Sequence, residues 1–199
     1  NESLKYLGLK NKKIINSRKY KHIQANKLFF VSHPWYSKGK FHDQSHNLPK
    51  WQIIWLKETF LKFKKKFNIN KNIYIDRSES KFSHCQIINH LELKKYLKKK
   101  KFKIVKLASQ SFAKQIYMFW NANCIIGAHG AALTNLVFSK PKTKVIELKP
   151  FRHPGKNYQR ISKVNNLHYY SIESQKKYLK NKNGDIFVDL KKLDRKINL

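Results

Sequence analysis

The chain is poor in cysteine, poor in glycine and free of long apolar runs, and each shortage excludes something. Two cysteines cannot build a disulfide framework, so we expect a reducing compartment, the cytoplasm. No stretch approaches the about 18 consecutive apolar residues that a membrane-spanning helix needs. The sequence begins at Asn1 rather than at methionine, which indicates a processed or truncated amino terminus. With 199 residues, 41% of them apolar, the chain can bury one full domain plus part of another.

Acidic residues are also scarce, 11 against 44 lysines and arginines, which gives a formal net charge of +33. Such an excess is typical of proteins that bind polyanions, either nucleic acid or an anionic membrane. Most of the basic residues are lysines spread over the whole chain, however, so codon bias in AT-rich DNA is the simpler explanation. Where lysine is the common cation, an arginine indicates a need for its planar, bidentate guanidinium. Arg77 is the arginine best placed for that role.

Two of the six glycines fall within one apolar segment, CIIGAHGAALTNLVF, at residues 124–138. The segment begins like a buried parallel strand and continues with helix-forming residues after Gly130. A strand, a glycine turn and a helix start would present unpaired backbone N–H groups to a phosphate, with His129 at the mouth of the site. Alternatively, Gly127 and Gly130 only let the strand and the helix approach each other. The spacing is G-x-x-G and lacks the G-x-G-x-x-G of dinucleotide-binding turns.

Strand and helix patterns alternate along the chain. Strands are expected at residues 28–31, 73–75, 104–107, 124–126, 145–148 and 168–172. Helices are expected at residues 51–67, 89–100, 112–120, 131–138 and 157–166, with Asn89 and Ser111 as caps. Helices between successive strands predict parallel β-α-β units with right-handed crossovers. The predicted fold class is therefore α/β, a Rossmann-like parallel sheet flanked by helices.

Open parallel sheets bind ligands at the edge where the carboxyl ends of their strands meet. At that edge we expect Arg77, residues 109–110, the turn at 127–130 and residues 150–152. A cation, a glycine turn and a histidine together predict a site for a diphosphate.

The segment from Ile73 to Pro150 resembles the carboxyl-terminal half of the family 61 glycosyltransferases, also called the DUF563 family. The resemblance rests on IYIDR, IINHLEL, FAKQIYMFWNANCIIGAHGAALTNLVF and KVIEL in this order, with GDIFVDLKKL near the end. By resemblance, the donor-binding residues are Arg77, Asn89, Gln115, Gly127, His129, Gly130, Ala131, Thr134, Asn135 and Glu147. Two positions depart from the family's pattern. His84 and Cys85 stand where the family tends to have a second arginine, and His90 stands where it tends to have glutamate.

The resemblance implies a GT-B architecture in which the carboxyl-terminal Rossmann-like domain binds a nucleotide-sugar, UDP-linked, and transfer inverts the anomeric configuration. It implies a glycan or other hydroxyl acceptor, in cell-surface polysaccharide biosynthesis. Accordingly, residues 1–70 are expected to form a partial acceptor-side region with a connecting helix. Residues 71–175 would form the donor domain, and residues 176–199 a carboxyl-terminal extension that ends in a helix.

Many glycosyltransferases hold a metal ion with a D-x-D pair, and this pair is absent from the sequence. We therefore expect metal-independent transfer without a cofactor. His33, His42 and His46 could instead suggest a metal site, but a compact second pair of ligands is missing there. His129 and Asp43 are predicted to be catalytic, and His42 and Asp76 are further candidates for the base that takes the proton of the acceptor hydroxyl.

Several predicted site residues could also have a purely structural role. Gln115 could bond only to neighbouring backbone, Thr134 and Asn135 could tie down the glycine turn, and Glu147 could be an ion-pair partner rather than a ligand of a sugar or ribose hydroxyl. Two alternatives to an active enzyme stay open: an inactive or fragmentary transferase-like scaffold, and a basic nucleic-acid-binding module. The expected partners are a nucleotide-sugar, a glycan acceptor and, through the lysines, the anionic inner membrane, with no specific nucleic acid.

Overall fold

The computed structural model describes residues 2–29, 47–78, 84–176 and 184–199. The catalytic candidate Asp43 lies outside these residues, as do His33, His42 and His46. The strand predicted at 28–31 lies partly outside them. Its described residues, Leu28 and Phe29, are 78% and 80% exposed and form no strand, so this part of the prediction is wrong. An apolar run becomes a strand only where other elements pair with it and bury it.

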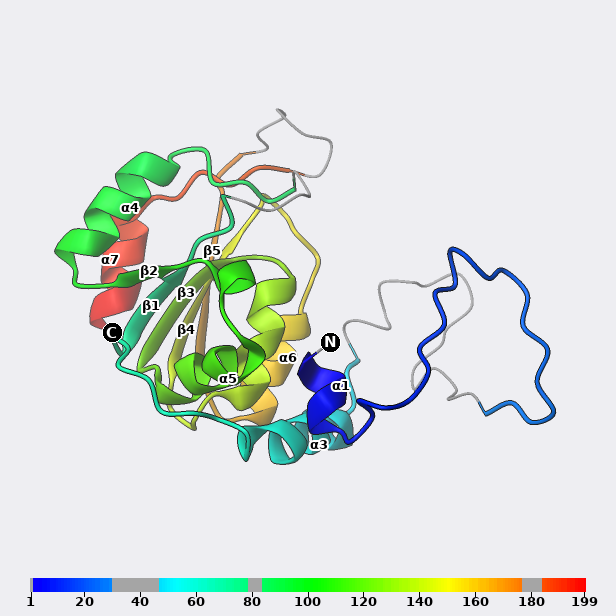
Figure 1. The fold of residues 1–199 in the computed structure, drawn as a ribbon. Coiled ribbons are helices and arrows are strands. Elements are labelled where there is room, and N and C mark those ends of the chain that lie inside the picture. Colours follow the sequence, from blue (N-terminus) through cyan, green and yellow to red (C-terminus); the bar gives the residue numbers. More distant parts are fainter. Residues whose placement is uncertain (1, 30–46, 79–83, 177–183) are drawn as a thin grey trace.

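A five-stranded, fully parallel sheet forms the centre of the molecule, in the order β2-β1-β3-β4-β5 (Figure 1). This confirms the α/β class and the Rossmann-like arrangement. The strands are β1 (Asn72–Ile75), β2 (Lys103–Val105), β3 (Cys124–Ala128), β4 (Lys144–Lys149) and β5 (His168–Glu173). The central strands β3 and β4 are buried almost throughout, as expected for continuous apolar runs covered on both faces.

Helices cover both faces of the sheet (Figure 1). One face carries α3 (Lys50–Leu61), α5 (Phe112–Asn121), the 3₁₀-helix η2 (Ala131–Phe138) and α6 (Asn157–Val164), with the short helix α1 (Glu2–Tyr6) beside them. The other face carries α4 (His90–Lys99) and α7 (Leu190–Asn198). Successive residues of β1 point to alternate faces, so Ile73 and Ile75 pack in the first core and Tyr74 in the second.

Three elements differ most from the predictions. Helix α3 ends at Leu61 rather than at residue 67, because the lysines at 62 and 64–66 would place like charges on neighbouring turns. The strand predicted at 104–107 ends at Val105, and a 3₁₀ turn, η1 (Leu107–Ser109), follows. The segment after Gly130 is a 3₁₀-helix rather than an α-helix. Ser111 caps α5 as predicted, since its hydroxyl accepts a hydrogen bond from the backbone N–H of Lys114.

Both ends of the described chain pack against elements of this one fold. Glu2 accepts a 2.7 Å hydrogen bond from the backbone N–H of Phe112 at the start of α5, and the Tyr6 ring stacks on Phe63 with 4.4 Å between the centroids. Near the carboxyl end, Ile186 forms a parallel bridge with Ile87, and α7 follows beside β5. The domain limits expected at residues 70 and 175 stay a prediction. Within the described residues, no helix is long and apolar enough to cross a membrane.

Candidate functional site

The chain turns to opposite faces of the sheet after two neighbouring strands, β1 and β3. After β1 it enters α4 on one face, and after β3 it enters η2 on the other. The crevice between two such strand ends is the point where open α/β sheets bind ligands. Arg77 follows β1, and His129 and Gly130 follow β3, so the sequence motif and the arginine lie at this crevice.

Arg77 bridges the crevice. Its Nη1 donates a hydrogen bond to the backbone carbonyl of His129. Gly130 makes this contact possible, since a Cβ atom at that position would lie 2.3 Å from Nη1 of Arg77. The structure therefore brings together the predicted cation and the second glycine. Gly127 has a different position: it lies inside β3, and a Cβ there would lie 3.0 Å from Cδ2 of Leu133, which fits a packing role for this glycine.

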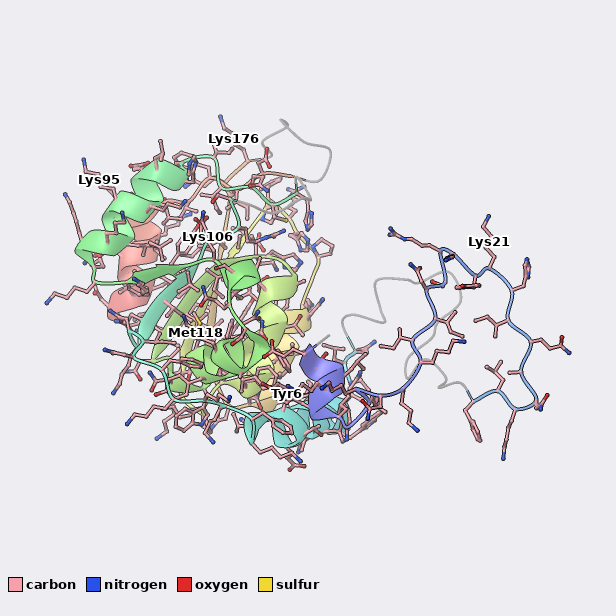
Figure 2. All side chains as sticks on the ribbon, in the orientation of Figure 1. Tyr6, Lys21, Lys95, Lys106, Met118 and Lys176 are labelled. Carbon is pink, nitrogen blue, oxygen red and sulfur yellow. The ribbon has the colours of Figure 1, made fainter. Side chains whose placement is uncertain are left out.

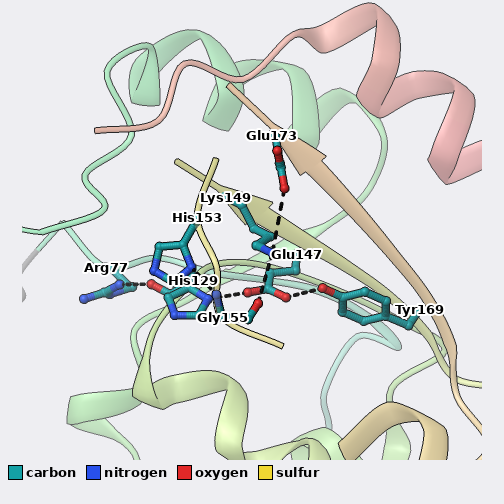
Figure 3. A network of polar contacts seen from close by, with 8 residues as sticks. All are labelled: Arg77, His129, Glu147, Lys149, His153, Gly155, Tyr169 and Glu173. Carbon is teal, nitrogen blue, oxygen red and sulfur yellow. Dashed lines mark hydrogen bonds and ion pairs between the residues drawn. The ribbon is translucent and has the colours of Figure 1, made fainter. Parts of the chain in front are cut away.

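A buried carboxylate forms a hydrogen bond with the His129 ring (Figure 3). Its Nδ1 lies 2.5 Å from Oε1 of Glu147, whose side chain is only 1% exposed, while the His129 side chain is 13% exposed. Tyr169 donates its hydroxyl hydrogen to the other oxygen of Glu147. Burial, with the neighbouring Glu147 carboxylate, raises the pKa of Tyr169, so this phenol stays protonated. A carboxylate oxygen only accepts, so Nδ1 of His129 carries the proton of this hydrogen bond, and Nε2 is the ring nitrogen left for other groups.

A loop after β4 covers the other side of the His129 ring. The His153 ring lies against it with 3.8 Å between the centroids, and the Tyr158 ring lies 5.1 Å away. A Cβ at Gly155 would lie 2.8 Å from Cε1 of His129, so the loop approaches closely only because this residue is glycine. Lys149, which is 7% exposed, holds the loop by donating a 3.0 Å hydrogen bond to the Gly155 carbonyl. This imidazole is thus fixed on two sides (Figure 3).

Asp76, a candidate base, is engaged in an ion pair. Its carboxylate lies 2.7 Å from Nζ of Lys94 on α4 and accepts two hydrogen bonds from Ser78. Burial alone would raise the pKa of Asp76, but the bonds from Lys94 and Ser78 outweigh it and hold the pKa below its ordinary value. The ionised carboxylate borders a cavity of about 220 Å³ beside Arg77 on the α4 side, lined also by Tyr74 and Cys85.

Four other predicted donor ligands hold secondary-structure elements together. Asn89 stands at the first position before α4 but makes no capping bond; its amide exchanges two 3.0 Å hydrogen bonds with the backbone of Val188. Asn89 is therefore the cap residue of α4 by position, as predicted, but its side chain bonds to a partner 99 residues away instead of to a backbone N–H of the helix. Gln115 donates to the carbonyls of Leu107 and Gln110 and accepts from Asn135.

Asn135 also donates to the carbonyl of Ala132, and the exposed Thr134 bonds to the Tyr158 side chain. Ala131 is the first residue of η2 and is exposed. These contacts fit a structural role, and donor binding by these residues stays a prediction. Sequence reasoning missed Tyr169, Lys149 and His153; the only signal was that Lys149 and His153 follow a predicted strand end.

A parallel sheet with an arginine and a supported histidine at its crossover crevice defines a Rossmann-like α/β protein. Residues 9–146 match the Glycosyltransferase 61 family, and this match covers more than half of the chain. The chain belongs to that family.

Two plant proteins are similar to part of the chain. One is the Beta-1,2-xylosyltransferase RCN11 of Oryza sativa subsp. japonica, 35% identical over 65 residues. The other is the Beta-1,2-xylosyltransferase of Arabidopsis thaliana, 33% identical over 66 residues. Each match covers 33% of this chain and 12% of the relative, so the chain spans a small part of the length of these proteins.

Proposed function

We propose that the chain is the donor-binding part of an inverting glycosyltransferase that transfers a sugar from a UDP-sugar to a hydroxyl group of a glycan, in cell-surface polysaccharide synthesis. The observation that carries this proposal is the position of Arg77 and His129 at the crossover crevice, where an anionic ligand would contact both. The two named relatives are xylosyltransferases, so xylose is the first sugar to test.

Arg77 supplies the positive charge that the leaving diphosphate needs. Its guanidinium is always protonated, and its planar set of donors suits phosphate oxygens. The backbone N–H groups at the start of η2, next to Gly130, add further donors. Because these groups stabilise the developing charge directly, we propose that transfer needs no metal ion.

His129 is the proposed base for the acceptor hydroxyl. The Glu147 carboxylate fixes the ring by its Nδ1–H and stabilises the imidazolium that forms when Nε2 takes up the proton. Tyr169 and the Lys149–Gly155 contact hold this carboxylate and this ring in place. Asp43, outside the described residues, is the other proposed catalytic residue.

Ligand-induced thermal stabilisation tests the proposal. UDP-xylose or UDP at about 100 times its Kd should stabilise the fold by about 2.7 kcal/mol, seen as a higher Tm. Arg77→Lys and His129→Ala should remove most of this shift, whereas Arg18→Lys and His168→Ala, which alter exposed residues elsewhere, should keep it.

A shift that persists in a chelator supports metal-independent binding, and a shift that needs added Mn²⁺ or Mg²⁺ contradicts it. If no UDP-sugar or nucleotide changes the Tm, the chain is better described as an inactive scaffold. Salt-sensitive binding to nucleic acid without nucleotide-sugar binding would favour the nucleic-acid-binding alternative.

We also propose that the protein is cytoplasmic and makes peripheral contact with an anionic membrane. This proposal is supported by the net charge of +33, since lysines near an anionic surface each contribute about 1 kcal/mol of attraction.

A further inference from the structure

A second basic side chain lies next to Arg77 at the crevice. Nη2 of Arg77 lies 3.5 Å from Nε2 of His84, while Nη1 of the same guanidinium donates to the His129 carbonyl. A guanidinium has only donors, so Nε2 of His84 must be unprotonated to accept from it. This hydrogen bond therefore forms only when His84 is neutral. A protonated His84 would place two cations side by side.

The charges around His84 favour this neutral form. Burial lowers the pKa of His84, and so do the Arg77 guanidinium at the end of β1 and, in its protonated form, His129 at the end of β3. The carboxylates of the surrounding elements have partners of their own: Asp76 pairs with Lys94, Glu147 is held by His129 and Tyr169, and Asp185 accepts from the backbone N–H of Gln86. The neighbouring Cys85 thiol has a raised pKa because it is buried, so it adds no negative charge.

We propose that His84 is a second anion-binding residue of the donor site and that it takes up one proton from solvent when the diphosphate of a nucleotide-sugar binds. The inference rests on the proposed function. A diphosphate within reach of both side chains attracts each of them, and these attractions offset the repulsion that otherwise disfavours a protonated His84 beside Arg77. The imidazolium then donates from Nε2 to a phosphate oxygen, beside the guanidinium that already faces the site.

Proton uptake makes affinity depend on pH with a definite sign. Bound diphosphate raises the pKa of His84 above its value in the free protein. Between these two pKa values each binding event consumes a proton, so affinity falls as pH rises, by up to about tenfold per pH unit. Above both values the affinity reaches a weaker plateau at which Arg77 binds the diphosphate without His84.

Calorimetric titration with UDP-xylose measures this uptake directly. A UDP-sugar has no group that titrates near neutrality, unlike the terminal phosphate of UDP, so any proton taken up enters the protein. Titrations between pH of about 6 and about 8, each in two buffers with different ionisation enthalpies, give the number of protons and the Kd. We expect an uptake that approaches one proton and a Kd that rises with pH.

Three variants assign the proton. His84→Gln keeps a hydrogen-bond donor but cannot ionise, so it should bind more weakly at low pH, with no uptake and a constant Kd. His84→Arg provides a permanent cation and should bind tightly across the whole pH range, again without uptake. His168→Gln, the same substitution at the start of β5 on the opposite edge of the sheet, should behave like the wild type.

The outcomes separate this inference from the function on which it rests. If UDP-xylose binds and the uptake persists in His84→Gln, the proton enters His129 or His153 and the inference is wrong. It is also wrong if the wild type binds with a Kd that does not change with pH. If no UDP-sugar binds at any pH, the proposed function fails. Circular dichroism melts of each variant check that the fold is retained.

Discussion

At the scale of single residues, the carboxylate of Glu147 lies where a charge is costly in free energy. It is almost fully buried, and its two oxygens are bonded to His129 and Tyr169. A buried charge of this kind is tolerated only when its hydrogen bonds are made. Glu147 therefore fits the role of orienting His129 better than that of a direct ligand of a sugar hydroxyl, although the sequence allowed both.

Tyr169→Phe should destabilise the fold. The change removes one donor from a buried carboxylate, and hydrogen bonds to charged groups contribute about 1.5–3 kcal/mol. We expect the free energy of unfolding, measured by urea denaturation, to fall by about that amount. The next residue supplies a matched control, since Tyr170 packs on the other face of the sheet. Tyr170→Phe should change stability by less than about 0.5 kcal/mol. Equal losses in the two variants would mean that the bond to Glu147 contributes nothing.

At the scale of elements, one ion pair connects the end of β1 with α4. Asp76 and Lys94 lie 2.7 Å apart, and the Asp76 side chain is 4% exposed against 23% for Lys94. The pair fixes the chain just before Arg77, so it also positions the guanidinium at the crevice. Because the pKa of Asp76 is lowered in the folded protein, its stabilising effect is fully present above the unfolded pKa and is lost as pH falls through the folded one.

Asp76→Asn should therefore reduce stability near neutral pH and have little effect in acid. At pH of about 7 we expect a loss of about 1–3 kcal/mol, because Lys94 is left without its partner. The difference between variant and wild type should shrink below pH of about 4, where Asp76 of the unfolded wild-type chain takes up a proton while the folded protein still holds it ionised. Urea denaturation at a series of pH values measures both quantities. Lys94→Met and the double variant complete a mutant cycle, and a coupling of zero would contradict the role of the pair.

The sequence predicted best the elements whose pattern records burial on two faces. β1, β3 and β4 were expected within two residues of their observed limits, because a short continuous apolar run between turns is typical of a parallel strand covered on both faces. The edge strand β5 was also expected within two residues of its limits, although only Ile172 in it is buried. η2 was harder, since an apolar segment of eight residues does not distinguish a 3₁₀-helix from an α-helix. The early end of α3 depends on repulsion among lysines, which periodicity does not record.

The position of a site residue could be predicted where that residue lies next to the carboxyl end of a single predicted strand. Arg77 and His129 lie within two residues of the ends of β1 and β3, so the rule for parallel sheets was enough to place them. Contacts that depend on strand register, or on packing between residues far apart in the sequence, could not be predicted from the sequence. Tyr169 reaches Glu147 because β4 and β5 are paired with Glu147 opposite Ser171, and Asn89 bonds to Val188 only because the carboxyl-terminal segment returns to α4.

At the scale of the whole molecule, the positive charge is distributed rather than concentrated. Figure 2 shows basic side chains on widely separated parts of the described chain: Lys21 on the amino-terminal segment, Lys95 on α4, Lys106 after β2 and Lys176 after β5. A distributed charge is what codon bias would produce, whereas a selected binding surface would gather its lysines on one face. These two origins predict different behaviour at an anionic membrane.

Binding to vesicles distinguishes a distributed charge from a dedicated surface. The protein should sediment with vesicles that contain phosphatidylglycerol, should not sediment with pure phosphatidylcholine, and should be released as salt rises from about 0.05 to about 0.5 M, because screening shortens the reach of each charge.

Replacing Lys95, Lys98 and Lys99 on α4 by glutamine removes three exposed charges from one helix. Replacing Lys10, Lys12 and Lys13 removes three exposed charges from the amino-terminal segment. If the charge acts as a whole, the two triple variants should lose affinity by the same factor. A loss confined to the α4 variant would overturn this expectation and identify that helix as a membrane-binding surface.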